Sequence, residues 1–181
     1  MARVPERQVP GVHHRRVGAD AVVTAVSDGH LDGSMAVIQN IEPEEAARML
    51  RDAFRPVPRR TAVNTFLIHS GGRLALVDTG CGSAMAATAG KLQENLAAAG
   101  VRPEEVDAVL LGETGASARA AAAALAAAMP ESPPRVLGTA LWAADSNLAG
   151  EPALADAWFP APDPAARANF ESRYATAFGE R

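Results

Sequence analysis

Residues 62–78, AVNTFLIHSGGRLALVD, carry the strongest local structural signal in the chain. Two runs rich in β-branched and other apolar residues, 62–69 and 73–78, flank the turn Ser70-Gly71-Gly72. Apolar runs joined by a short glycine-bearing turn predict a β-hairpin. Because neither face of the first run is polar, we expect that strand to be covered on both sides.

The segments around the hairpin predict an α/β chain. Two further apolar runs are typical of buried strands, 20–28 and 106–111. Helical patterns are expected over residues 43–54, 85–99 and 117–129, with a last helix after Pro162-Asp163-Pro164. We expect the hairpin and the two strands to form one sheet, with the first three helices against it.

The composition excludes several classes of protein. The chain has 181 residues, 41 of them alanine, and only 8 Phe, Trp or Tyr residues, so its apolar stabilisation is modest. A formal net charge of -4 with few aromatics argues against a nucleic-acid partner. No run approaches the roughly 20 apolar residues that a membrane helix needs. The polar, proline-broken stretch 1–10 is no secretory signal, so we expect a bacterial protein of the cytoplasm.

Five stretches of the first part share one family pattern. They are VTAVSDG (23–29), TAVNTFLI (61–68), LVDTGCG (76–82), LQENLAAAG (92–100) and VDAVLL (106–111). In this order they resemble the opening half of metallo-β-lactamase-fold hydrolases, over about residues 12–111. The resemblance implies an αββα sandwich with a Thr-His-x-His-x-Asp-His metal motif directly after the last of these strands.

The metal motif itself is absent from the sequence. Residues 112–117 read GETGAS, and all four histidines, at positions 13, 14, 30 and 69, precede them. A catalytic zinc ion needs at least three converging His or carboxylate ligands and an open position for water. We therefore interpret the resemblance as truncated before the metal motif and predict no metal ligands, no catalytic residues and no cofactor.

Three residues remain as candidates for a site. By the resemblance, Asp78 supports the metal-binding loop; without that loop it is a strand-end cap. Asp28 is a similar candidate for the floor of the site and otherwise a turn former before Gly29. Cys81, the single cysteine, is a reactive thiol only if the nearby helix N-terminus lowers its pKa, and is otherwise an ordinary small residue.

The C-terminal part of the chain has a different look. Its short motifs are DAVLLG (107–112), RVLGTALW (135–142), EPAL (151–154) and AWFPAPDP (157–164). Over about residues 107–181 they resemble a fragment of a periplasmic ligand-binding domain of the kind found in penicillin-binding-protein activators. That family has two α/β lobes and binds its ligand between them.

The two resemblances together give an expected organisation. The fold class is α/β (mixed α+β), with an incomplete half of an αββα sandwich joined to an α/β lobe fragment. We expect a flexible arm (1–18), a metallo-β-lactamase-like half domain (19–111) and a periplasmic-binding-like fragment (112–181). The chain is then a hybrid, or chimera, whose two parts share the strand 107–111.

Three functional hypotheses follow. The first is a catalytically silent protein with a degenerate metal site. The second is a zinc-dependent hydrolase of an ester, lactone or lactam, whose metal site would use Asp28, Asp78, His69 and Glu113. The third is a small-ligand binding module built on the C-terminal fragment.

The expected partners follow from the missing second sheet. We expect a small molecule as the partner, with no nucleic acid and no membrane. The apolar sheet face that a second sheet would cover predicts self-association, unless the aromatic helix that carries Phe170 and Tyr174 covers it.

Overall fold

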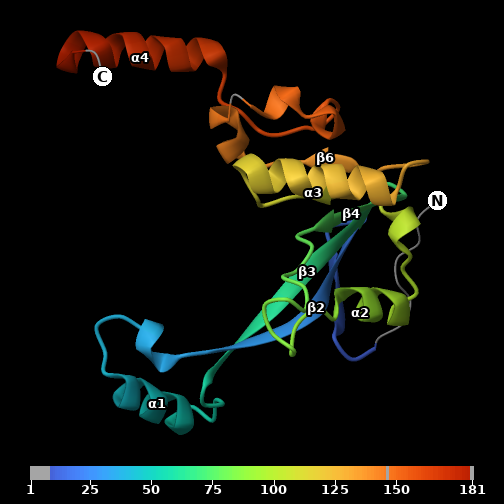
Figure 1. Ribbon diagram of the computed structural model, residues 1–181, viewed down its shortest axis with the longest axis vertical. Coiled ribbons are helices and arrows are strands. Elements are labelled where there is room, and N and C mark those ends of the chain that lie inside the picture. The colour runs from blue at the N-terminus through green and yellow to red at the C-terminus, as the bar shows by residue number, and fades with distance from the viewer. Residues whose placement is uncertain (1–8, 146, 180–181) are drawn as a thin grey trace.

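The computed structural model describes residues 9–145 and 147–179 (Figure 1). Its strands are β1 (Val12–Val17), β2 (Ala21–Gly33), β3 (Arg59–Ser70), β4 (Arg73–Val77), β5 (Ala108–Leu110) and β6 (Arg135–Leu137). Its α-helices are α1 (Pro43–Asp52), α2 (Leu92–Ala98), α3 (Gly115–Ala128) and α4 (Pro164–Phe178). The expected mixed α/β class is confirmed.

The six strands form one sheet in sequence order. Strands β1 to β4 pair antiparallel, and the predicted hairpin is present as β3 and β4. Strands β5 and β6 continue the sheet in parallel with β4. Each parallel step needs a crossover connection, and α2 and α3 lie in these two connections. The sheet therefore runs without a break from the first part of the chain into its C-terminal part.

Several local expectations need correction. Residues 12–17 form β1 and are not part of a flexible arm, because their backbone pairs with β2; residues 1–8 of the expected arm lie outside the described residues. The helix expected from residue 85 starts only at Leu92. Near the end of the chain, Trp158 forms a single parallel bridge with Leu137.

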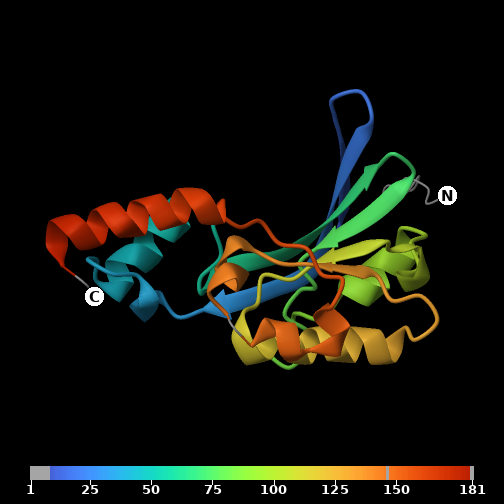
Figure 2. The same cartoon turned by 90° about the horizontal axis from the view of Figure 1, so that it is seen from above.

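One face of the sheet forms the core. Along the strands, alternate residues are buried against the helices; they include Val26, Leu67, Leu76, Val109 and Val136. Figure 2 shows α2 and α3 on the same side of the sheet. This sharing of one side is the geometry that right-handed crossovers dictate for neighbouring parallel strands.

The opposite face of the sheet is apolar and uncovered. Val23 and Ala25 of β2 pair with Ile68 and Phe66 of β3, which pair in turn with Ala75 and Val77 of β4. We call these six residues the bare sheet face. Phe66 is 40% exposed, whereas its neighbour Leu67 on the other face is 1% exposed. The expectation that both sides of the first hairpin strand are covered is thus wrong.

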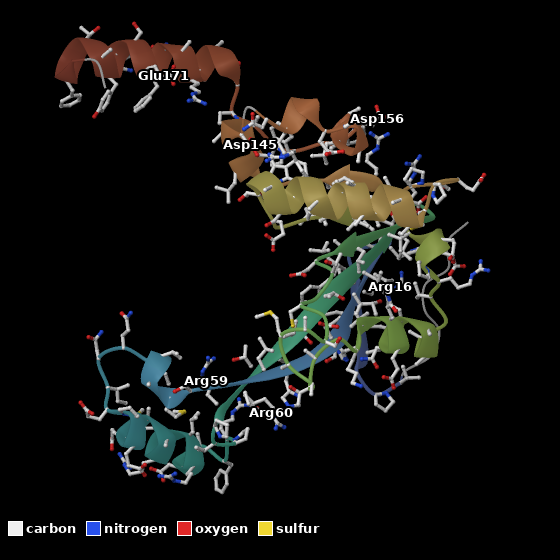
Figure 3. All side chains as sticks on the ribbon, in the orientation of Figure 1. Arg16, Arg59, Arg60, Asp145, Asp156 and Glu171 are labelled. Carbon is white, nitrogen blue, oxygen red and sulfur yellow. The ribbon has the colours of Figure 1, made fainter. Side chains whose placement is uncertain are left out.

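The aromatic C-terminal helix does not cover the bare sheet face. In Figure 1, α4 projects from the end of the molecule opposite α1, and in Figure 3 the side chains around Glu171 have no other described element beside them. Phe170 is 66% and Phe178 75% exposed.

No helix in the described ranges has the length and apolar character needed to cross a bilayer.

Trp142 joins the segment after β6 to the segment after β5. Its side chain is 2% exposed, and its indole Nε1 donates a hydrogen bond of 2.8 Å to the Glu113 carbonyl. Its ring lies 6.1 Å from that of Phe159, and a Cβ atom at Gly138 would overlap it. The tail is thereby packed onto α3 as part of the same core.

Gly138→Ala tests this packing. The added methyl group has no room beside the Trp142 ring, so we expect the free energy of unfolding to fall by about 1–3 kcal/mol. Gly112→Ala is the matched control, because a Cβ there meets nothing within 4 Å, and should change stability by less than about 0.5 kcal/mol. Urea unfolding followed by tryptophan fluorescence and by far-UV circular dichroism measures both. Equal stabilities for the two variants would contradict the packing.

Candidate functional site

The candidate site lies at an irregularity within β2, beside the ends of β4 and β5. The pairing of β2 with β3 shifts between Ser27 and Gly29, which leaves Asp28 as the extra residue of a β-bulge. Gly29 has φ +109°, and a Cβ on it would overlap the Thr88 carbonyl oxygen, so only glycine fits there. The bulge turns Asp28 into the interior, where it is 1% exposed.

The buried Asp28 carboxylate binds the loop between β4 and α2. Its Oδ2 accepts hydrogen bonds from the backbone N–H groups of Cys81 (2.9 Å) and Gly82 (3.2 Å). Its Oδ1 accepts one from the N–H of Leu92 (2.9 Å), at the start of α2. Burial alone would raise the pKa of Asp28, but these backbone donors outweigh it and leave the pKa lowered.

Further contacts close the same loop onto β2. The Lys91 N–H donates to the Asp28 carbonyl at 3.1 Å, and the Asn95 side chain donates to the Ser27 carbonyl at 2.7 Å. The Gly80 backbone lies so close to Asp28 that a Cβ there would come within 2.5 Å of the carboxylate. Asp28 is therefore the centre of a clasp formed by residues 79–92.

Asp78 occupies the end of β4 but is not bound into this clasp. Its backbone has φ +68°, in the left-handed region, and its Oδ1 accepts a hydrogen bond of 2.9 Å from the Gly80 N–H. The residue is exposed. This geometry is that of a turn-forming aspartate at a strand end.

The Cys81 thiol is not activated by its surroundings. Burial raises its pKa, and the adjacent negative charge of Asp28 raises it further. A thiolate is the nucleophilic form, so this environment disfavours the reactive state at neutral pH. The suggestion that Cys81 is a reactive thiol stays a prediction that this geometry does not favour.

The segment after β5 lies where the resemblance implies a metal-binding loop, but it lacks the ligand residues of such a loop. The Glu113 side chain is exposed, and its backbone carbonyl is the acceptor for Trp142. Helix α3 begins at Gly115, immediately after this short connection. Glu113 thus offers one carboxylate, and the residues beside it up to Ser117 offer none.

Three of the four histidines lie away from this end of the sheet, whereas His30 lies on β2 two residues after Asp28, with its Nε2 3.9 Å from the Asp32 carboxylate. His69 pairs with Leu74, four residues before Asp78 along β4, which corresponds to about 13 Å at ~3.3 Å per residue. His13 lies in the row of Val77 but three strands away, about 14 Å at ~4.8 Å per strand. His14 Nδ1 lies 2.9 Å from the Thr24 hydroxyl. None of these rings converges with Asp78 and Glu113.

The donor set does not fit a catalytic zinc ion. Both Asp28 oxygens already accept backbone hydrogen bonds, and His69 lies too far along the sheet to join Asp78. Within residues 9–145 and 147–179, no three His, Cys, Asp or Glu residues form a group that could hold a metal ion. Zinc requires ligands about 2 Å from the ion, so the four residues Asp28, Asp78, His69 and Glu113 do not form the site considered from the sequence.

A cavity of about 430 Å³ adjoins the Asp28 clasp. Its floor is formed by Leu76 and Val109 of the sheet, and α2 contributes Leu92 and Leu96. The α3 side is formed by Leu125 and Met129; most other residues of α3 are alanine and fill little space. Four polar residues also line the cavity: Asp28, Thr79, Ser83 and Gln93.

Comparisons with known proteins agree with the fold. Residues 58–111 match the family described as the metallo-beta-lactamase superfamily. The solved structure of hydrolase AbOPH, in the beta lactamase superfamily, matches with a TM-score of 0.58 and 21% identity. The match covers 87% of this chain, so it extends well beyond Leu111. The chain therefore has a metallo-β-lactamase-like fold, and the likeness continues into the C-terminal part.

The chain spans 63% of the AbOPH structure that it matches. A second solved structure is that of AidC, a dizinc quorum-quenching lactonase in complex with a product, with a TM-score of 0.49 and 23% identity. This match covers 56% of the present chain and 35% of the AidC chain. No curated protein shows significant similarity to the chain. The periplasmic-binding resemblance of residues 107–181 is not supported by these matches and stays a prediction.

Asp28→Asn tests the clasp. An amide NH₂ accepts no hydrogen bond, so asparagine leaves either the Leu92 N–H or the Cys81 and Gly82 N–H groups without their acceptor, and we expect a loss of about 2–4 kcal/mol in the free energy of unfolding. Asp78→Asn is the matched control. Asparagine tolerates the left-handed backbone and its side-chain oxygen still accepts from Gly80, so its stability should stay within about 0.5 kcal/mol of wild type. Equal losses in both variants would contradict the assignment.

The pH dependence of that difference gives a second readout. Because the pKa of Asp28 is lowered on folding, its stabilisation is complete above the unfolded-state value of about 3.9. It is lost as the pH falls through the lower folded-state value. The stability gap between wild type and Asp28→Asn should therefore narrow on acidification below about pH 4. A gap that stays constant in acid, measured by urea unfolding, would argue against a charged carboxylate in the clasp.

Proposed function

We propose that this chain is a non-catalytic protein with a metallo-β-lactamase-like fold, in which the segment that should carry the metal ligands is replaced by a short connection. The observation that carries the proposal is the position of the donors. The histidines lie on β1 to β3, and the Asp28 carboxylate is already occupied by backbone N–H groups. A zinc site needs three ligands within about 2 Å of one point, and the described side chains do not supply them.

The alternative is a metal-dependent hydrolase of an ester, lactone or lactam. It is suggested by the superfamily match and by the similarity to AbOPH, which is a hydrolase. To act in this way, the chain would need His69 to move about 13 Å along the sheet, or ligands supplied by another molecule. The rigid pairing of β3 with β4 opposes such a movement.

Metal content and hydrolysis together test the proposal. Protein purified without chelator and dialysed against zinc should retain well under one zinc ion per chain by elemental mass spectrometry. It should also hydrolyse a chromogenic cephalosporin, a p-nitrophenyl ester and a γ-lactone no faster than buffer does. One zinc ion or more per chain, with hydrolysis that a chelator abolishes and zinc restores, would overturn the proposal in favour of the hydrolase.

A second function, binding of a small apolar molecule, is favoured by the cavity beside the clasp. Its volume of about 430 Å³ lies within the range of small-molecule sites, and its lining is mainly apolar with a few polar residues. The α3 side of the cavity is lined by Leu125 and Met129, and the α2 side by Leu92 and Leu96. This binding module uses residues from both parts of the chain, such as Leu96 and Leu125.

Leu125→Trp tests the cavity. The larger ring should fill the space, so binding of the apolar dye N-phenyl-1-naphthylamine should weaken at least tenfold while the melting temperature is kept or raised. Leu141→Trp is the matched control, because Leu141 is exposed and does not line the cavity. Dye fluorescence titration measures both. Unchanged dye affinity in Leu125→Trp would exclude the cavity as the binding site.

A further inference from the structure

Two apolar surfaces of the chain have no partner within it. The first is the bare sheet face defined above, of which Phe66 and Ile68 are the most exposed members. The second is a row of rings on α4, formed by Phe170, Tyr174 and Phe178, which we call the aromatic ridge. Successive ring centroids in the ridge lie 6.0 and 5.0 Å apart. Exposed apolar patches of this kind mark interaction surfaces.

The chain cannot easily bring its own ridge onto its own sheet. The stretch from Phe159 to the first residue of α4 reads FPAPDP, with Pro160, Pro162 and Pro164 at alternate positions. Proline-rich segments are extended and semi-rigid, so this one holds α4 away from the body. Residues 165–179 are all exposed, in accordance with that separation (Figure 1).

We propose that the occupant of the bare sheet face is the aromatic ridge of a second copy of this chain. In a symmetric dimer, α4 of each copy lies on the sheet of the other, so both copies cover both surfaces at once. Such an exchange of an element is an isologous contact, which closes after two copies and leaves no free surface for further growth. The covering role of the second sheet in a complete αββα sandwich is then taken by a helix from the partner.

The dimensions of the two surfaces agree. The ridge spans eight residues, or about 12 Å at ~1.5 Å per residue. The bare sheet face spans three strands, about 10 Å at ~4.8 Å per strand spacing. Both surfaces are uncharged, since neither Val23, Ile68 and Val77 nor the ridge contributes an ionised group. Arg15 of β1 pairs with Val23 and so flanks this face, and its long side chain can keep the guanidinium in solvent beside a helix that lies across the three strands.

The area is sufficient for a stable dimer. One aromatic side chain buries roughly 150–250 Å² when fully covered, so three partly exposed rings contribute roughly 300–400 Å² per copy. The sheet covered beneath them contributes a similar area, and the exchange occurs twice. The total is on the order of 1,500 Å², the size of a standard protein interface. A formal net charge of only -4 per chain adds little repulsion between two copies.

The oligomeric state of the full chain is the first test. Sedimentation velocity should show wild type as a dimer at micromolar concentration. Phe170→Ser with Tyr174→Ser on the ridge should weaken the dimer at least 100-fold, and so should Phe66→Thr with Ile68→Thr on the sheet. Phe170 and Tyr174 are both exposed, so the far-UV circular dichroism of the variant that replaces them should match that of wild type. A monomeric wild type at 100 µM, or a dimer that survives the ridge pair, would overturn the proposal.

Phe54→Asn is the matched control. Phe54 is another exposed aromatic residue, at φ +55°, a backbone conformation that asparagine adopts readily, and it belongs to neither surface. It should leave the dimer intact. If it dissociates the dimer as strongly as the ridge pair does, general surface hydrophobicity and not the ridge is responsible, and the proposal fails.

Cysteine cross-linking distinguishes the possible arrangements. In a Cys81→Ser background, one variant carries Ala75→Cys on the bare sheet face and another carries Ala177→Cys beside the ridge. The proposal expects a disulfide only when the two variants are mixed and oxidised. A disulfide-linked dimer of the Ala177→Cys variant alone would show ridge-to-ridge pairing. A disulfide-linked dimer of the Ala75→Cys variant alone would show sheet-to-sheet pairing. Either result would overturn the proposed exchange of helices.

Discussion

The organisation of this chain depends on one buried, charged carboxylate that backbone N–H groups stabilise by hydrogen bonds. Asp28 is directed inward by a β-bulge, and its two oxygens bind the loop after β4 and the start of α2. A buried charge is costly unless it is hydrogen-bonded, and here the donors come from segments that are distant from Asp28 in the sequence. The clasp therefore fixes α2 over the sheet and shapes one end of the cavity beside it.

This same interaction limits the chemistry. A carboxylate that serves as an acceptor for three backbone donors has little capacity left for a metal ion, and the remaining donors are spread over the sheet. The segment after β5, where the fold would carry its ligands, is instead joined to the tail by Trp142. The chain keeps the scaffold of the metallo-β-lactamase-like fold and uses its candidate site to hold loops together. Two other features remain for binding: a cavity between α2 and α3, and an uncovered sheet face.

Much of the fold could be predicted from the sequence, because local patterns decide it. The hairpin around Gly71 and the helix from Pro43 are confirmed, since turn chemistry and apolar spacing act over a few residues. The clasp could not be predicted, because Asp28 and Cys81 are far apart in sequence; the only signals were the Asp28-Gly29 pair and the glycines of the loop. The start of α2 was placed seven residues too early for the same reason: long-range hydrogen bonds hold residues 85–91 outside the helix. The uncovered sheet face could not be predicted either, because it depends on which elements of the chain do not pack on it.

The central claim is that the fold persists without a metal centre of its own, and cobalt(II) titration tests it most directly. A four- or five-coordinate protein site gives Co²⁺ intense visible d–d bands, whereas hydrated Co²⁺ absorbs weakly. Titration of the metal-free protein should leave the weak spectrum of the hydrated ion up to several equivalents, with unchanged circular dichroism. Intense bands that saturate at one or two equivalents and vanish on addition of zinc would contradict the account.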